Sequence, residues 1–155
     1  MKLGEAVQAV EDGFFTSTPG ARSIYSRLQE KLDASNGLWT ILECVDADAA
    51  YDISVSRSSL LSAYESRDIA AMYDANAELD KAFAEAESAL DGAELSEGEQ
   101  KSLESYVSTY EGASKMIEQN SYNSSVLEFM RSVFNKFPAS RLAAFAGVEP
   151  PVSFE

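Results

Sequence analysis

The distribution of proline is the feature that most limits the folds open to this chain. Its four prolines are Pro19, Pro138, Pro150 and Pro151, so none falls between residues 20 and 137. That long stretch is rich in Ala, Glu, Leu and Lys, which are strong helix formers. No segment of it alternates between apolar and polar residues with the period of two that marks a half-buried strand. The pattern predicts an all-α protein.

Apolar residues in this stretch recur at intervals of three and four, as the buried face of a helix requires. The successive groups are Ile24, Leu28 and Leu32; Leu38, Ile41, Leu42, Val45 and Ala49; Met72, Ala75, Leu79, Ala82, Phe83, Ala86 and Leu90; Leu103, Tyr106, Val107, Tyr110, Ala113 and Ile117; and Tyr122, Val126, Phe129, Val133 and Phe137. Because these faces must cover one another, we expect an antiparallel four-helix bundle with long helices and short loops. A single domain would span residues 1–155, with residues 1–17 either flexible or a short helix and residues 138–155 a tail packed on the bundle.

Capping signals indicate where helices begin. Thr18 followed by Pro19 is typical of an N-cap and a first helical residue. Ser66 together with Asp68 predicts the start of a third helix. Ser96, with Glu99 three residues later, has the spacing of a capping box.

Glycines and polar segments indicate where helices end. Asn36-Gly37 predicts a turn after the first helix of the bundle, and Gly92 fits the position just past a later helix. A helix from residue 97 to residue 136 would be about 60 Å long at ~1.5 Å per residue. Gly112 and the polar residues 118–121 are the places where it would bend.

The charge of the chain bounds its partners. Asp and Glu number 26 against 12 Lys and Arg, so the net charge is −14. Such a surface repels nucleic-acid phosphates and anionic lipid headgroups. We therefore expect no nucleic-acid partner and no direct binding to a bare membrane.

Residues with catalytic potential are scarce. The chain has no histidine, which removes the usual general base, the catalytic triads and the commonest metal ligand. Cys44 is the only cysteine and has no obvious activating base, so we expect a small core residue. Trp39 is expected to anchor the core. The sequence predicts no catalytic residue, no cofactor and no metal ligand, and hence no enzyme.

Two groups of carboxylates leave one alternative open. They are Asp46, Asp48 and Asp52, and Asp91, Glu94, Glu97 and Glu99. Hard cations prefer oxygen ligands, but clustered acids are more often a solvated face. The alternative function is therefore a soluble helical bundle that binds a metal or a small molecule through clustered carboxylates.

The C-terminal segment carries a family resemblance. In one ungapped register, Phe137, Pro138, Ala143, Gly147, Pro150, Phe154 and Glu155 match the pattern F-P-x-N-x-x-A-x-x-x-G-F-x-P-x-x-x-F-E. Tyr122-Asn123 upstream resembles a Y-N-x-x-V segment. Together these residues resemble the LemA family of bacterial helical, membrane-associated proteins. The chain departs from the pattern at Ser140 and Val148, and Asn36-Gly37 stands where the family usually has Pro-Asn.

The resemblance implies a four-helix bundle, usually with one N-terminal transmembrane anchor, and no agreed biochemical activity. It implies a non-enzymatic interaction or scaffold role with other proteins at the bacterial cytoplasmic membrane. No apolar run in this sequence approaches the ~18 to 20 residues that cross a bilayer. The sequence thus either begins after such an anchor or represents a soluble branch. The side of the membrane and the oligomeric state stay open.

The apolar residues of the tail can be buried in two ways. Leu142, Phe145 and Phe154 either pack on the bundle or serve as a docking segment for a partner. We expect packing, because exposed apolar tails usually fold back onto their own chain.

Overall fold

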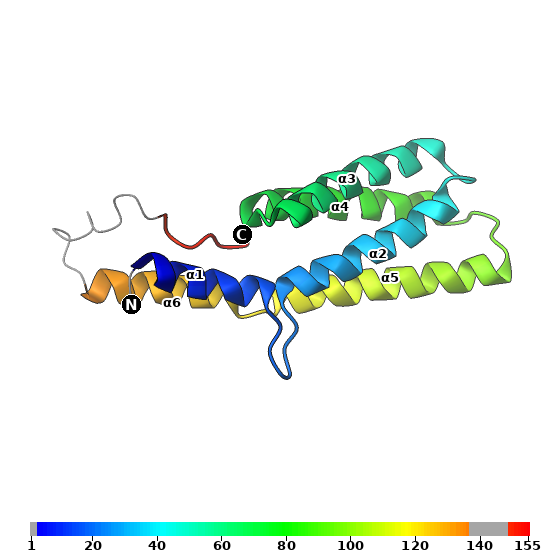
Figure 1. The fold of residues 1–155 in the computed structure, drawn as a ribbon. Helices are drawn as coiled ribbons and strands as arrows, with labels where there is room; N and C mark the ends of the chain where they lie inside the picture. Colours follow the sequence, from blue (N-terminus) through cyan, green and yellow to red (C-terminus); the bar gives the residue numbers. More distant parts are fainter. Residues whose placement is uncertain (1–2, 137–148) are drawn as a thin grey trace.

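The computed structural model describes residues 3–136 and 149–155. These residues contain six α-helices and no strand (Figure 1). The helices are α1 (Leu3–Phe15), α2 (Ile24–Leu42), α3 (Ala47–Ser66), α4 (Ile69–Leu90), α5 (Glu97–Glu118) and α6 (Tyr122–Lys136). The prediction of an all-α protein is confirmed, and residues 3–15 form a short helix.

The four long helices pack as two connected pairs. Helix α2 lies along α5, α3 lies along α4, and α2 also contacts α3. Helices α3, α4 and α5 each run opposite to the helix before them, whereas α2 continues in the direction of α1 and α6 in the direction of α5 (Figure 1). Helix α1 packs beside α6. Helix α2 therefore holds the central position, since it contacts α1, α3, α4 and α5.

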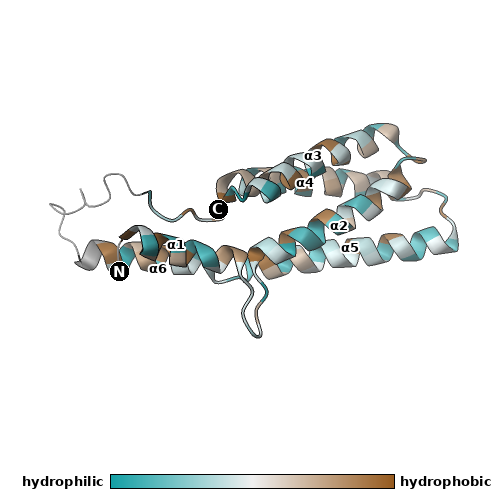
Figure 2. Cartoon of the chain, in the orientation of Figure 1, coloured by the Kyte–Doolittle hydropathy of each residue, from teal (hydrophilic) through white to brown (hydrophobic). Residues whose placement is uncertain are grey.

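The core follows the predicted apolar faces. Brown hydrophobic and teal hydrophilic residues alternate along the helices (Figure 2). The predicted face of α4 is confirmed in full, and its members are all buried: Met72, Ala75, Leu79, Ala82, Phe83, Ala86 and Leu90. On α2, Ile24, Leu28, Leu32, Leu38, Ile41 and Leu42 are buried as predicted. Trp39 is half-buried and packs against this core.

Three of the capping predictions are confirmed. The Asp68 side chain accepts a hydrogen bond from Ala71 N–H at the start of α4. Ser96 and Glu99 form a complete capping box at the start of α5. Gly92 follows the end of α4 with φ of +79°, a conformation that favours glycine.

Helix α2 begins later than Thr18-Pro19 predicts. Its N-cap is Ser23, whose hydroxyl accepts a hydrogen bond from Ser26 N–H. Residues 18–21 instead form a tight turn in which Thr18 and Ala21 exchange backbone hydrogen bonds. Proline in the second place of this turn and Gly20 in the third, with φ of +87°, are the residues that a type II turn prefers. The turn chemistry outweighs the capping signal.

The turn predicted at Asn36-Gly37 is wrong, because α2 runs through it without a break. Gly37 instead meets α5, where a Cβ atom would lie 2.5 Å from the ring of Tyr106. The glycine thus serves a close helix contact. The true turn comes at residues 43–46, and it leaves Cys44 exposed, which corrects the prediction that Cys44 is a core residue. Val45 is also exposed, against prediction.

The long C-terminal helical stretch is interrupted where its sequence is most polar. Helix α5 ends at Glu118 and α6 begins at Tyr122. The side-chain oxygen of Asn120 accepts a hydrogen bond from Tyr122 N–H at 2.9 Å and so satisfies a free donor at the start of α6. The break lies in the predicted segment. Phe137 lies outside the described residues.

The contact between Gly37 and Tyr106 makes a testable prediction. Alanine normally stabilises a helix interior by about 0.5–1 kcal/mol relative to glycine. We expect Gly37→Ala to lower the free energy of unfolding by about 1–3 kcal/mol instead, because the new methyl group overlaps the Tyr106 ring. In a Tyr106→Ala background, the same change should become stabilising.

The control is Gly112→Ala on α5, where an added Cβ meets no heavy atom of the described residues within 4 Å. It should raise stability by about 0.5–1 kcal/mol. Urea titrations of the five chains measure these differences. Equal effects at positions 37 and 112 would contradict the close approach of α2 and α5 at Gly37.

Candidate functional site: a buried lysine beside a C-terminal clasp

A fully buried lysine lies at the centre of the helical core. Lys31 of α2 is 1% exposed, although lysine is almost never fully buried unless it is paired. Its ammonium donates hydrogen bonds to Asn76 Oδ1 at 2.6 Å and to Asp80 Oδ1 at 2.7 Å. Both acceptors project from one face of α4, because they are four residues apart. Lys31 therefore joins α2 to α4.

Tyr110 of α5 completes this group. Its hydroxyl donates a hydrogen bond to Asp80 Oδ1 at 2.5 Å. Its ring stacks on Phe83 with 3.7 Å between centroids, and the Lys31 ammonium lies 4.7 Å from the ring centroid. We call Lys31, Asn76, Asp80 and Tyr110 the lysine cluster. It connects three helices through one carboxylate.

Burial sets the electrostatics of the lysine cluster. It lowers the pKa of Lys31, an effect that the neighbouring Asp80 carboxylate opposes. It raises the pKa of Tyr110 far above the ordinary value, and Asp80 adds to this rise. The Asp80 side chain is itself 48% exposed, so water solvates the free side of its carboxylate. Lys31 and Asp80 thus form an ion pair in which the lysine is buried and the carboxylate faces solvent.

A cavity of about 360 Å³ adjoins the lysine cluster. Its lining residues are Lys31, Tyr73, Asn76, Asp80, Ser114, Ile117, Glu118, Asn123 and Phe154. The Ser114 hydroxyl is buried and has no hydrogen-bond partner among the described residues. Two carboxylates, Asp80 and Glu118, lie in the wall, but neither belongs to a buried residue. The cavity therefore offers mixed polar groups and no concentrated charge of either sign.

The C-terminal segment closes one side of this cavity. The side-chain oxygen of Asn123 accepts a hydrogen bond from Phe154 N–H at 2.7 Å, and its amide group donates one to Phe154 C=O at 2.9 Å. The Tyr122 hydroxyl donates a hydrogen bond to Val152 C=O. We call residues 151–155, together with Tyr122 and Asn123, the C-terminal clasp. Within the clasp, Tyr122 and Asn123 bind the tail through backbone groups of Val152 and Phe154.

Phe154 provides the apolar contact of the clasp. Its side chain is 5% exposed and packs between Phe14 of α1 and Tyr73 of α4, at centroid distances of 5.5 and 5.3 Å. Phe14 in turn meets Tyr122 edge to face. The prediction that Phe154 packs on the helices is confirmed. Leu142 and Phe145, for which the same was predicted, lie outside the described residues.

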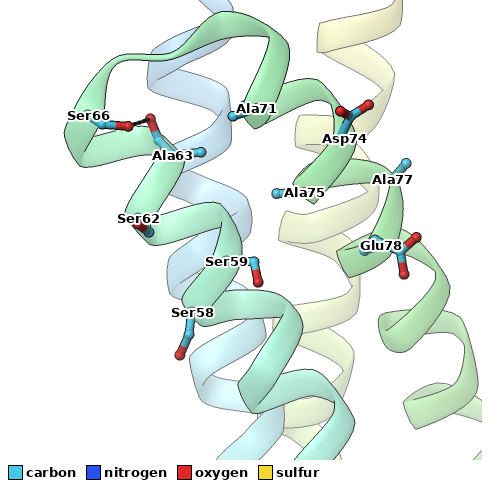
Figure 3. Close-up of a pocket in the computed structure, with 10 residues that line it drawn as sticks. All are labelled: Ser58, Ser59, Ser62, Ala63, Ser66, Ala71, Asp74, Ala75, Ala77 and Glu78. Carbon is cyan, nitrogen blue, oxygen red and sulfur yellow. Dashed lines mark hydrogen bonds between the residues drawn. The ribbon is translucent and has the colours of Figure 1, made fainter.

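A shallower hollow lies between α3 and α4 (Figure 3). Small side chains and two acids line it, namely Ser58, Ser59, Ser62, Ala63, Ser66, Ala71, Asp74, Ala75, Ala77 and Glu78. The Ser66 hydroxyl is already bonded to Ala63 C=O, whereas Asp74 and Glu78 project from α4 at the opposite side (Figure 3). This hollow is wide open to solvent, and more of its lining is apolar than polar.

Two of the predicted carboxylates take part in helix capping. Asp46 caps α3, where its side chain accepts hydrogen bonds from Asp48 N–H and Ala49 N–H. Glu99 accepts a hydrogen bond from Ser96 N–H, which lowers the pKa of Glu99. Within residues 3–136 and 149–155, no three His, Cys, Asp or Glu side chains are placed to hold a metal ion.

Sequence reasoning missed Lys31, although a signal was present. Lys31 follows Leu28 by three residues and precedes Ser35 and Leu38 by four and seven, so it lies within the apolar face of α2. A charged residue at such a position requires a partner in the core. Nothing in the sequence identified Asp80 as that partner, because the two residues are 49 positions apart.

No helix in the part of the chain that the structure describes has the length and apolar character needed to cross a bilayer. Comparison with protein-family models, with curated proteins and with solved structures found no match. The function must therefore be inferred from the residues and their geometry.

The lysine cluster predicts an asymmetric response to mutation. We expect Lys31→Met to lower the free energy of unfolding by about 1–3 kcal/mol, because Asn76 is left buried with an unpaired carbonyl oxygen. Adding Asn76→Leu should recover at least half of that loss, since Asp80 can turn to water. Lys81→Met, at an exposed position of α4, is the control and should change stability by less than about 0.5 kcal/mol. If Lys31→Met behaved like this control in denaturant titrations, Lys31 would have no role in packing.

Tyr110 predicts a loss of stability at alkaline pH. A phenol whose pKa is higher in the folded than in the unfolded chain keeps its full contribution below about pH 10. Above that pH the unfolded chain loses the proton first, so stability falls by up to about 1.4 kcal/mol per pH unit. Tyr110→Phe should make this fall less steep between about pH 10 and 11.5. Tyr51→Phe, at an exposed position, should leave the slope unchanged, and an equal slope in all three chains would contradict the burial of Tyr110.

Proposed function

We propose that this chain is a LemA-like helical domain that works without catalysis, through contacts with other proteins at the bacterial cytoplasmic membrane. An N-terminal anchor outside this sequence would tether it there, with α2–α5 as an antiparallel four-helix bundle. The observation that carries the proposal is the C-terminal clasp. Tyr122-Asn123 and Phe154, which carry the resemblance, contact one another although about 30 residues separate them.

The clasp supports the resemblance because it gives the signature residues a shared physical role. An asparagine side chain offers both a donor and an acceptor, so it can bind the N–H and the C=O of one residue together. Tyr122, at the preceding position, donates a further hydrogen bond to Val152 C=O. If these residues matched the family pattern only by chance, there would be no reason to expect them to form hydrogen bonds with one another.

The exposed face of α3 supports a protein partner. Tyr51 is 69% exposed and Val55 is 48% exposed, and the two lie one turn apart. Continuing along the helix in steps of four and three, this face reaches Ser62 and Ser66 in the hollow of Figure 3. A large aromatic and a branched aliphatic side chain lie here beside small ones, which leaves room for a partner helix. The net charge of −14 favours a partner with basic residues at its rim.

The chemistry of Lys31 supports a role without catalysis. The amine is bound by Asn76 and Asp80 within 2.7 Å, and protonated lysine is a poor nucleophile. The second candidate function is binding of a small polar molecule in the cavity beside Lys31. The unpaired Ser114 hydroxyl in the cavity wall favours it. The metal-binding form of this alternative has less support, because Asp46 and Glu99 are engaged as helix caps.

The proposed function predicts a membrane location and a partner on the α3 face. We expect the product of the complete reading frame to sediment with bacterial membranes. A photocrosslinking amino acid at position 51 should yield one adduct of defined mass in living cells. The matched control is the same amino acid at exposed position 101 on α5, which should yield none.

Soluble product with equal labelling at both positions would contradict this function. A thermal midpoint that rises with one small metabolite, and does not rise in a Ser114→Val chain, would favour the second candidate instead.

A further inference from the structure

The clasp holds its tail as a peptide-binding protein holds a ligand. Two side chains, Tyr122 and Asn123, make three hydrogen bonds, and all three go to backbone groups of Val152 and Phe154. One side chain, that of Phe154, enters the core, while Glu155 is exposed. Backbone hydrogen bonds with a pocket for one side chain are a recurring mode of recognition for extended peptides.

The groove that receives the tail has its own support. Phe14 packs edge to face against both Phe15 and Tyr122, at 4.9 and 5.4 Å. Phe15 continues the cluster to Tyr25, which stacks on Tyr64 at 3.8 Å. None of these contacts involves residues 149–155. The Phe14 and Tyr122 side of the receiving wall is therefore held by contacts among the helices.

The tail is suited to bind as a separate segment. Pro150-Pro151 restrict the backbone to extended conformations, so less entropy is lost when the segment binds. Pro151 is buried, as is Phe154. The contacts depend on a short sequence, Pro-Val-Ser-Phe, and the same segment of a second molecule has the same groups to offer.

We propose that the groove formed by Phe14, Tyr73, Tyr122 and Asn123 is a peptide-recognition site that also takes residues 149–155 from a second copy of the chain. Exchange of an identical element costs little, because the tail of one molecule makes the same hydrogen bonds and apolar packing in the groove of the other. The chain's own tail competes at a high effective concentration, so exchange becomes visible when that competition is removed. This inference goes beyond the proposed function, since it concerns another surface and does not need a membrane.

The test uses full-length chains and a fluorescein-labelled peptide of residues 149–155, Glu-Pro-Pro-Val-Ser-Phe-Glu. Phe154→Ala removes the anchor of the resident tail and leaves the groove intact. We expect this chain to bind the peptide saturably and at least tenfold more tightly than the unchanged chain does. A peptide with alanine in place of its phenylalanine should not bind. Adding Asn123→Ala to the Phe154→Ala chain should abolish binding of the first peptide.

Complementation between two variants tests the second copy as the occupant. The Phe154→Ala chain has an intact groove, and an Asn123→Ala chain has an intact tail. Each alone should be monomeric in light scattering, whereas an equimolar mixture should contain a heterodimer. If Phe154→Ala proves unfolded by circular dichroism, Phe154→Leu, which fills the pocket less completely, replaces it.

Three results would overturn the proposal. One is absence of peptide binding to a folded Phe154→Ala or Phe154→Leu chain, and another is equal binding of both peptides. The third is peptide binding with a mixture that stays monomeric, which would exclude a second copy as the occupant. None of these results bears on the membrane fractionation or on crosslinking at position 51, so failure here and failure of the proposed function are distinguishable.

Discussion

The burial of the Lys31 ammonium is the constraint on which the packing of the long helices depends. A charge in the core must be neutralised and hydrogen-bonded, or the fold loses several kcal/mol. Asn76 and Asp80 meet this need from α4, and Tyr110 bonds the same carboxylate from α5. These hydrogen bonds are directional, so they are satisfied in one register of α2 against α4 and α5. The lysine cluster thus selects one arrangement among those that the apolar faces allow.

The clasp extends the same principle to the end of the chain. Asn123 is half-buried and offers a donor and an acceptor, and the backbone of Phe154 satisfies both. The Phe154 ring covers Phe14 and Tyr73 and forms part of the wall of the cavity beside Lys31. The tail and the lysine cluster are therefore neighbours in space, since Phe154 and Lys31 line the same cavity.

Local sequence signals gave correct predictions where a residue acts on backbone groups a few positions away. Ser96 with Glu99, Asp68 and Gly92 act within a few residues, and each has the predicted role. Other local signals were wrong, either because a competing local turn formed, as at Thr18-Pro19, or because a distant helix packs at that position. Gly37 lies within α2 and not in a turn, and its lack of a side chain leaves room for the Tyr106 ring of α5. Cys44 is exposed because α2 continues to Leu42, which moves the turn onto residue 44.

Local patterns in the sequence predicted that the described residues are helical, which faces of several helices are buried and where several helices begin, because periodicity and capping act over one or two turns. It also indicated that Tyr122-Asn123 and the last residues belong to one pattern. The packing of the helices established the contacts that the sequence did not predict. Asn123 binds Phe154, Lys31 pairs with Asp80, and Phe154 packs against aromatic residues of α1 and α4. Such contacts join residues about 30 to 140 positions apart, and their partners are selected by how whole helices pack, which no local pattern encodes.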